Sequence, residues 1–211
     1  MNITSGALLT DLYELTMAQA YLAQGMTDIA VFEFFVRKLP PQRNFFMAAG
    51  LEQVLNYLEE FQFSDADIAW LDQTGGFSAS SLDALRAMRF TGEVHAMPEG
   101  SLFFFFLPIL RITAPLPQAQ LVETRVMNLL NFQTMVASKA CRSVLVAGDK
   151  PLIDFGLRRA HGAEAGLLAA RAAYLAGLAG TSNVSAGARF GIPIYGTMAH
   201  SFVQAHPDAA E

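Results

Sequence analysis

The sequence of 211 residues has little cysteine and little charge. Cys141 is its only cysteine, so an internal disulfide and a zinc site built on cysteines are both excluded. A single thiol suits a reducing cytosol, and we expect a cytoplasmic protein in which Cys141 is a small buried side chain. Charged residues make up only 16% and the net charge is -5, so no basic surface for nucleic acid and no nucleic-acid partner are expected.

Long apolar runs are also missing. The longest apolar run, residues 102–110, is too short to cross a bilayer and contains Pro108. Residues 1–16 lack a basic segment followed by an apolar one, so we expect no signal peptide and no membrane partner. Apolar bulk is abundant instead: 53% of the residues are apolar, with seventeen Phe and nine Met. This is ample for a core, and it leaves apolar surface to bury against something else.

The N-terminal half predicts a mixed α/β lobe. Apolar residues at helical spacing follow Thr10, which we expect to cap a helix reaching about Gly25. Residues 29–39 then alternate between apolar and polar, which is typical of a strand. Turn residues between the later strands indicate antiparallel pairing. The further expected elements are short helices over residues 50–61, 64–72 and 79–88 and strands over residues 92–97, 101–106 and 109–114.

The C-terminal half has a different rhythm. A long helix is predicted over residues 118–140, and Pro115 and Pro117 before it mark a domain boundary. We therefore expect an N-terminal lobe of residues 1–116 and a second domain of residues 117–211. From residue 150 a strand, an alanine-rich helix, a turn, another helix and the strand PIYGTM follow one another. This order predicts parallel strands with helical crossovers.

The stretch DFGLRRAHG offers groups for holding an anion. An extended chain places Asp154, Gly156 and Arg158 on one face and Arg159 on the other. A guanidinium that follows a strand suits a carboxylate or phosphate, because it presents two donors in one plane. Arginines that only form surface ion pairs are the alternative, and the residue spacing alone favours that alternative.

Two later stretches carry hydroxyls and a histidine. Thr181 and Ser182 precede a helix whose N–H groups suit an anion, but an ordinary helix cap by Ser182 or Asn183 explains the same pattern. His200 stands in IYGTMAHSFV, where Gly196, Thr197 and Ser201 also interrupt an apolar strand. The other histidines form no metal-ligand spacing with it, so no metal site is predicted. Taken alone, the residues indicate an α/β protein with an anion site.

Seven stretches together resemble one family, nicotinate phosphoribosyltransferase, in the family's order and over nearly the whole chain. They are LLTDLYELTMAQAY, FEFFVRKLP, GEVHAMPEG, PLPQAQLVETRVMNLLNFQT, DFGLRRAHG, GTSNVSAGARFGIP and YGTMAHSFV. The resemblance implies the type II phosphoribosyltransferase fold, an N-terminal α/β lobe with antiparallel strands followed by an irregular α/β barrel, with active sites formed across a homodimer. It also implies ATP-coupled transfer of phosphoribosyl from phosphoribosyl pyrophosphate to nicotinate, which gives nicotinate mononucleotide and pyrophosphate for NAD salvage.

The resemblance further implies roles for single residues. Tyr13 stacks on the nicotinate ring across the dimer, Arg158 pairs with the nicotinate carboxylate, and His200 is the residue that ATP phosphorylates. The residues implied to line the His200 pocket are Gly196, Thr197 and Ser201. The further substrate-binding candidates are Asp11, Asp154, Arg159, Thr181 and Ser182.

Two features depart from the family pattern. In SLFFFFLPILRI the family has a more polar stretch, with an acidic residue where Leu107 stands here. The family's barrel also continues past the histidine motif, and its later strands hold phosphoribosyl pyrophosphate and Mg²⁺. A closed barrel takes about 250 residues. We therefore expect the N-terminal lobe and the first part of an incomplete barrel, without turnover by this chain alone.

Two alternatives stay open. The first is a non-catalytic, truncated remnant that acts as a dimerisation or interaction module. The second is another substrate, quinolinate, which is a dicarboxylate. Quinolinate would require more cationic groups than Arg158 and Arg159, and it would leave His200 without a phosphoacceptor role.

Overall fold

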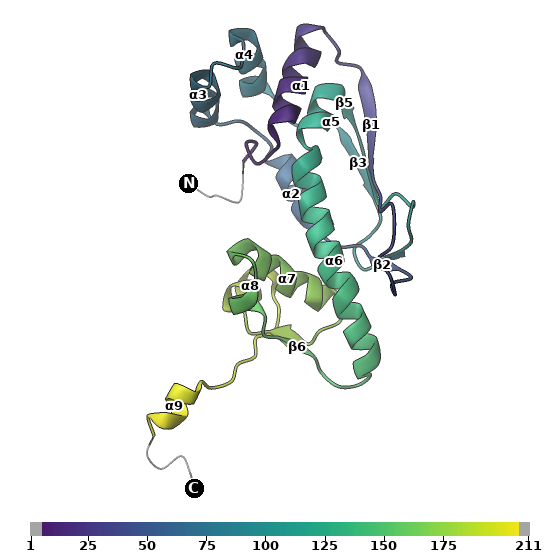
Figure 1. The fold of residues 1–211 in the computed structure, drawn as a ribbon, viewed down its shortest axis with the longest axis vertical. Coiled ribbons are helices and arrows are strands. Elements are labelled where there is room, and N and C mark those ends of the chain that lie inside the picture. The colour runs from purple at the N-terminus through teal and green to yellow at the C-terminus, as the bar shows by residue number, and fades with distance from the viewer. Residues whose placement is uncertain (1–5, 207–211) are drawn as a thin grey trace. The chain divides into compact units, whose positions relative to one another are not determined.

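The structure is a computed structural model that describes residues 6–206, and it divides into two compact units (Figure 1). The first unit ends at Lys139 and the second begins at Ala140. The long helix α6 (Glu123–Ala147) contributes residues to both units. Residues 116 and 117, where we expected a domain boundary, lie in the first turn of α5 (Leu116–Leu121).

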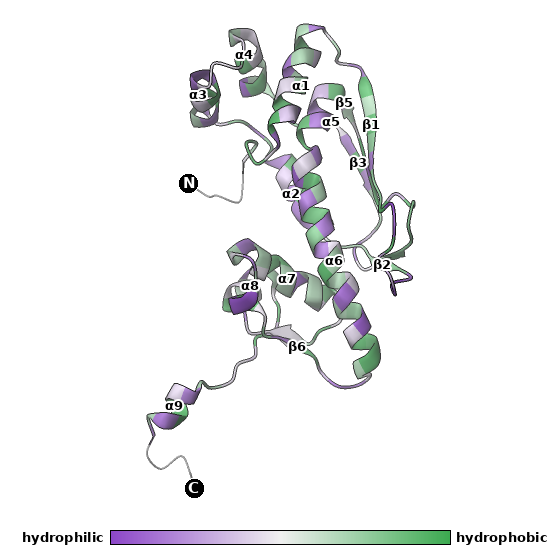
Figure 2. Cartoon of the chain, viewed as in Figure 1, coloured by the Kyte–Doolittle hydropathy of each residue, from purple (hydrophilic) through white to green (hydrophobic). Residues whose placement is uncertain are grey.

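The first unit contains a three-stranded antiparallel sheet in the order β1-β5-β3. Its strands β1 (Ile29–Phe34), β3 (Glu93–Ala96) and β5 (Leu110–Pro115) come from stretches that predicted strands, and Figure 2 shows the apolar character of β1 in green. A second antiparallel pair joins β2 (Phe46–Met47) and β4 (Leu102–Phe103). The buried rings of Phe46 and Phe103 lie 5.6 Å apart in this pair. The prediction of an antiparallel lobe is therefore confirmed.

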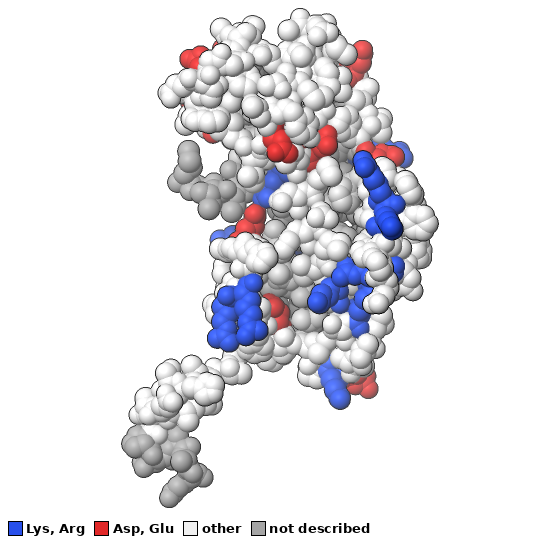
Figure 3. Space-filling view, viewed as in Figure 1, with Lys and Arg blue, Asp and Glu red and all other residues white. Residues whose placement is uncertain are grey.

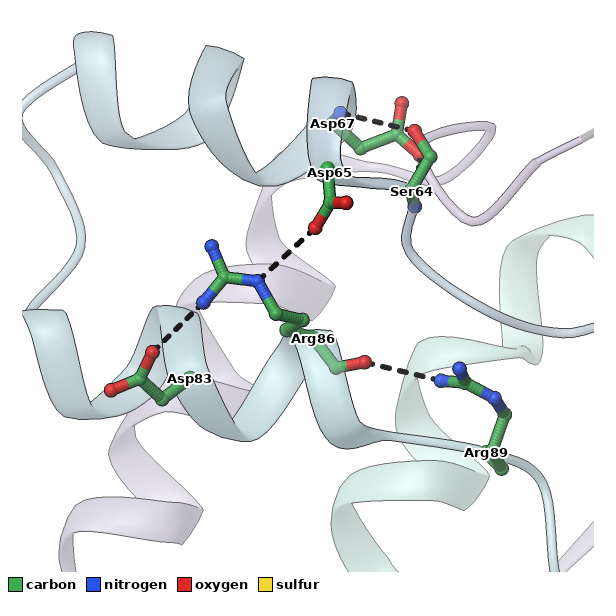
Figure 4. A network of polar contacts seen from close by, with 6 residues as sticks. All are labelled: Ser64, Asp65, Asp67, Asp83, Arg86 and Arg89. Atoms are coloured by element: carbon green, nitrogen blue, oxygen red, sulfur yellow. Dashed lines mark hydrogen bonds and ion pairs between the residues drawn. The ribbon is translucent and has the colours of Figure 1, made fainter.

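Helices α1 (Leu12–Ala23), α2 (Leu51–Glu59), α3 (Asp65–Gln73) and α4 (Ala79–Ala87) complete this unit. Short sequence signals set the start of α3, where Ser64 and Asp67 form a reciprocal capping box (Figure 4). Figure 4 also shows Arg86 of α4 paired with Asp83 at 2.9 Å and with Asp65 at 3.4 Å. All three side chains of these pairs are at least half exposed, so the capping box stabilises this region more than the ion pairs do.

The second unit is built on parallel pairing. Strand β6 (Ile153–Asp154) pairs with β7 (Gly180–Thr181), and Thr181 also forms a parallel bridge with Ile194. Helix α7 (Ala163–Leu175) connects β6 to β7, and α8 (Val184–Phe190) connects β7 to Ile194. The predicted order of parallel strands and helices is confirmed. The expected strand at residues 193–198 is only the single bridge at Ile194, and α9 (His200–Gln204) follows it.

Close backbone approach holds this parallel pairing together. A Cβ at Gly180 would collide with the carbonyl oxygen of Pro193 and with the ring of Tyr195, so only glycine fits there. Cys141, on the part of α6 that belongs to the second unit, is buried. Within residues 6–206 no helix is long and apolar enough to cross a bilayer.

Candidate functional site

Three of the predicted stretches follow the carboxyl ends of the parallel segments in the second unit. In α/β folds this edge of a sheet is where ligands bind. Asp154 ends β6, Thr181 ends β7, and Ile194 pairs beside Thr181. The backbone therefore brings the starts of DFGLRRAHG, GTSNVSAG and IYGTMAHSFV to one edge.

Asp154 and Thr181 are joined directly at this edge. The Thr181 hydroxyl donates to Asp154 Oδ2 at 2.7 Å, and Thr181 is fully buried. The other carboxylate oxygen, Asp154 Oδ1, accepts from the backbone N–H of Gly156 at 2.9 Å. Both side chains therefore help to fix the backbone at this edge, because each is hydrogen-bonded to protein partners.

The expected strand over residues 151–159 ends early for the same reason. The bond from the Gly156 N–H to the Asp154 side chain turns the chain, and Leu157–Arg159 form a short 3₁₀ helix. Asp154, Gly156 and Arg158 therefore do not share the face of one extended strand, and that prediction was wrong. Arg158 and Arg159 are both exposed on this turn.

Neither arginine forms an ion pair with another residue in the range 6–206. The alternative in which both form surface ion pairs is therefore not found in the described chain. The second unit, residues 140–211, contains six Arg and Lys against five Asp and Glu, so it is close to neutral overall. Figure 3 shows basic side chains, in blue, over the α8 segment. Unpaired, exposed guanidinium groups suit an anionic ligand.

The turn after β7 contains an ordinary helix cap, as the alternative to an anion site predicted. Asn183 is nearly fully buried, and its Oδ1 accepts from Ala186 N at 3.2 Å at the start of α8. Its Nδ2 donates to the Gly166 carbonyl oxygen at 3.3 Å, which ties α8 to α7. The cap is therefore Asn183 and not Ser182, which is half-buried.

The histidine motif lies away from the sheet edge. Gly196, Thr197, His200 and Ser201 are all exposed, and α9 begins at His200 after an extended stretch (Figure 1). The structure therefore brings Asp154, Thr181 and the residues that follow them together, and it does not bring His200 and Ser201 to the same edge.

In the first unit, Tyr13 and Asp11 stand at the start of α1. Tyr13 is about half exposed, and Asp11 precedes the helix and accepts from the Thr124 hydroxyl at 3.0 Å. The Thr10 hydroxyl donates to the Glu14 carboxylate instead of capping α1, so the expected Thr10 cap was wrong. The pKa of Tyr13 is raised by partial burial and then by the charges of Glu123 and Glu14, which keeps the phenol neutral.

Glu14 is the residue that sequence reasoning missed. It is fully buried, and its Oε1 accepts from the Thr124 N–H at 3.0 Å and from the Thr124 hydroxyl at 2.9 Å. Thr124 lies in the first turn of α6, so the carboxyl acts as a cap supplied by another helix. Burial raises the pKa of Glu14. The single sequence signal was its position in the stretch TDLYE, directly after Tyr13.

Residues 6–206 contain no cluster of three or more His, Cys, Asp or Glu side chains that could hold a metal ion. At the sheet edge, the carboxylate of Asp154 already accepts two hydrogen bonds from the protein. No step below is therefore routed through a metal.

Comparisons with known proteins point to one class of enzyme. Residues 8–131 match the family model described as the nicotinate phosphoribosyltransferase N-terminal domain, and residues 151–211 match the nicotinate phosphoribosyltransferase family. A nicotinate phosphoribosyltransferase of Mycobacterium tuberculosis is 54% identical over 200 residues, which are 95% of this chain and 43% of that protein. One of Bacillus subtilis is 45% identical over 96% of this chain and 41% of that protein.

Solved structures agree. The crystal structure of human nicotinic acid phosphoribosyltransferase has a TM-score of 0.86 and 40% identity, covering 95% of this chain and 42% of that one. The nicotinate-nucleotide pyrophosphorylase of Pyrococcus furiosus, at 24% identity and a TM-score of 0.77, shares the fold and covers 96% of this chain and 44% of that one. The fold is thus that of a phosphoribosyltransferase. The chain belongs to the nicotinate phosphoribosyltransferase family, and it spans about two fifths of the length of the relatives it matches.

Proposed function

We propose that the protein acts in nicotinate phosphoribosyl transfer, in which phosphoribosyl pyrophosphate and nicotinate give nicotinate mononucleotide and pyrophosphate. The observation that supports the proposal is the pair of arginines at the sheet edge of the second unit. Arg158 and Arg159 follow the carboxyl end of β6 and form no ion pair among the described residues, and the chain belongs to the nicotinate phosphoribosyltransferase family. We further propose that it works in the cytoplasm as a homodimer, with the domain boundary near residue 116 that the sequence predicts.

Nicotinate recognition requires one flat apolar surface and one forked cation. The Arg158 guanidinium donates two parallel hydrogen bonds to the nicotinate carboxylate, and Tyr13 of a second copy stacks on the ring. Asp154 and Thr181 act indirectly. Their hydrogen bonds fix the start of the turn that carries Arg158, and so they position its guanidinium. Arg159, Ser182 and Asp11 are the remaining side chains proposed near the substrate.

The transfer itself moves one bond. The lone pair of the nicotinate ring nitrogen forms a bond to the ribose carbon, and the bond from that carbon to pyrophosphate breaks, so that pyrophosphate leaves with the electron pair. Positive charge grows on the sugar and then on the ring nitrogen. Orientation of the two substrates by the protein therefore supplies most of the rate enhancement in this proposal.

His200 is proposed as the phosphoacceptor from ATP. An imidazole nitrogen attacks the γ-phosphorus, the bond to ADP breaks, and ADP leaves with the electron pair. Gly196, Thr197 and Ser201 provide a short polar segment around the phosphorylated ring. His200 is exposed at the start of α9, which is the access that such a reaction requires.

The test incubates the chain with labelled ATP, phosphoribosyl pyrophosphate and nicotinate, and measures acid-labile phosphate and nicotinate mononucleotide. We expect phosphate on the wild type and on His206→Ala, a matched control in the same helical region, and none on His200→Ala. Product that is lost in His200→Ala excludes the remnant hypothesis. This chain alone is expected not to turn over, so the absence of product does not test the proposal. The absence of phosphate on the wild type would overturn it and would leave an interaction module.

A second measurement separates the substrates. A ligand that binds only the folded state raises the melting temperature, so nicotinate and quinolinate are compared by thermal shift. We expect a shift with nicotinate that is lost in Arg158→Ala and weakened by roughly tenfold in affinity in Arg158→Lys, because lysine lacks the planar fork. A larger shift with quinolinate would contradict the proposed substrate.

A further inference from the structure

The end of the first unit's sheet carries an exposed cluster of large apolar side chains, which we call the aromatic tip: Phe35, Phe104, Phe105, Phe106 and Leu107. Each is between 38% and 64% exposed. The rings of Phe35 and Phe106 stack at 5.7 Å, and those of Phe105 and Phe106 meet edge to face at 5.9 Å. The rings of Phe35, Phe105 and Phe106 therefore join two segments in one apolar cluster.

Backbone geometry holds the tip outward. Phe106 has a φ of 57°, in the left-handed region that bulky side chains rarely adopt, and its N–H donates to the Val36 carbonyl oxygen at 2.9 Å. This bond fixes the turn to the end of β1, where the chain continues into Arg37 and Lys38. Neither the strained backbone nor the exposed rings favour folding of the unit itself, which indicates a role in contact with something else.

Two basic side chains adjoin the tip in sequence. Arg37 and Lys38 follow Phe35 after one intervening residue, and both are exposed. Neither Arg37 nor Lys38 forms an ion pair within residues 6–206. In Figure 3 basic side chains lie where β1 ends.

The segments that form the tip carry positive charge, whereas the first unit as a whole is acidic. Residues 34–51 and 100–109 contain no Asp or Glu, whereas residues 6–139 as a whole contain fourteen acidic and eight basic side chains. Exposed aromatic side chains beside an exposed Arg and Lys match the interface of an anionic bilayer, where rings enter the headgroup layer and cations meet lipid phosphates.

We propose that the aromatic tip, with Arg37 and Lys38, docks the protein reversibly on an anionic lipid surface. A second copy of the chain is less favoured, because the tip exposes roughly 500 Å², taking about 200 Å² for each aromatic side chain. A stable protein interface needs about 800 Å² on each partner. The lack of a membrane-spanning helix among residues 6–206 concerns crossing a bilayer and not lying on one. The proposal replaces the expectation from the sequence that there is no membrane partner. The proposal is independent of the catalytic proposal above.

The test uses the whole chain with its only tryptophan moved into the tip, as Trp70→Phe with Phe105→Trp. Vesicles of phosphatidylcholine with 30% phosphatidylserine are compared with phosphatidylcholine alone. We expect a blue shift of the tryptophan emission and co-sedimentation with the anionic vesicles only, weakening as salt is raised. Equal binding to neutral vesicles, or no shift with anionic ones, would overturn the proposal.

Variants then divide the contributions. Arg37→Gln with Lys38→Gln is expected to weaken binding about 25-fold at low salt, since each cation near the surface contributes about fivefold. Phe106→Asn keeps a residue that tolerates the left-handed conformation and removes the ring, so it is expected to weaken binding without unfolding the chain. Val184→Ser, an exposed apolar site on α8, is the control and should bind as the wild type. A dimer in sedimentation that Phe106→Asn abolishes would assign the tip to a second copy and overturn lipid docking.

Discussion

Replacing Glu14 by alanine removes the acceptor of several buried hydrogen bonds at once. The Thr124 N–H loses its partner at 3.0 Å, and the hydroxyls of Thr124 and Thr10 lose theirs. A buried donor left unsatisfied costs about 1–3 kcal/mol, and a backbone N–H cannot turn toward another acceptor as a hydroxyl can. We expect the free energy of unfolding to fall by about 3 kcal/mol in Glu14→Ala and by about 1 kcal/mol in Glu14→Gln, which keeps an acceptor oxygen.

The pH dependence of this stability has a defined sign. Burial raises the pKa of Glu14 in the folded protein above its ordinary value of 4.5, so the folded state holds the proton more tightly than the unfolded state. Its contribution to stability is complete below pH 4.5 and is lost as the pH rises through the folded-state pKa. Glu14→Gln does not titrate, so the stability of the wild type relative to Glu14→Gln should fall as the pH is raised above 4.5.

Urea unfolding followed by the fluorescence of Trp70 measures this effect. Trp70 is the only tryptophan and lies on α3, so its signal reports the first unit. Glu59→Gln, at the exposed end of α2, serves as the control and should change stability by less than about 0.5 kcal/mol. A Glu14→Ala variant as stable as the wild type, or a wild-type advantage over Glu14→Gln that grows with pH, would refute the reasoning.

Three further stability changes follow from caps and close contacts. Asn183→Ala should lower the free energy of unfolding by about 2 kcal/mol, since it removes the α8 cap and a buried hydrogen bond to α7. Ser182→Ala should lower it little, and urea unfolding followed by circular dichroism measures both variants. Ser64→Ala should cost about 1 kcal/mol and Arg86→Met less than about 0.5 kcal/mol in the Trp70 assay, and the reverse order would contradict the ranking of cap over exposed ion pair. Gly180→Ala should disrupt the pairing of β7 with residue 194, seen as faster amide exchange there, because the added methyl group collides with the chain opposite; unchanged protection would disprove the collision.

Local signals account for most of what the sequence predicts correctly. Helices α3 and α4 begin where Ser64 and Ser78 offer caps, and both signals lie within three residues of the groups they satisfy. The parallel pairing of β6 and β7 follows from the order of strands and helices. These features depend on neighbours in sequence or on general rules of topology, and so they could be predicted.

Long-range contacts account for what it does not predict. Nothing near Glu14 indicates that Thr124, 110 residues away, uses its carboxylate, and a lone glutamate on a helix is ordinarily expected in solvent. The strand at residue 153 ends because Asp154 bonds Gly156 and, across the sheet, Thr181. The family resemblance indicated Arg158 and His200 as site residues. The structure adds that both are exposed and that Arg158 forms no ion pair among residues 6–206.

The single thiol on α6 can report local opening of the protein by chemical labelling. Because Cys141 is buried and is the only cysteine, a thiol-specific probe added to the native protein reacts only when the helix around it opens. The rate of thiol labelling therefore measures how often the segment around Cys141 opens. A cysteine introduced elsewhere on the surface would accept a dye long before Cys141 does, so spectroscopic pairs can be built without first removing the native residue.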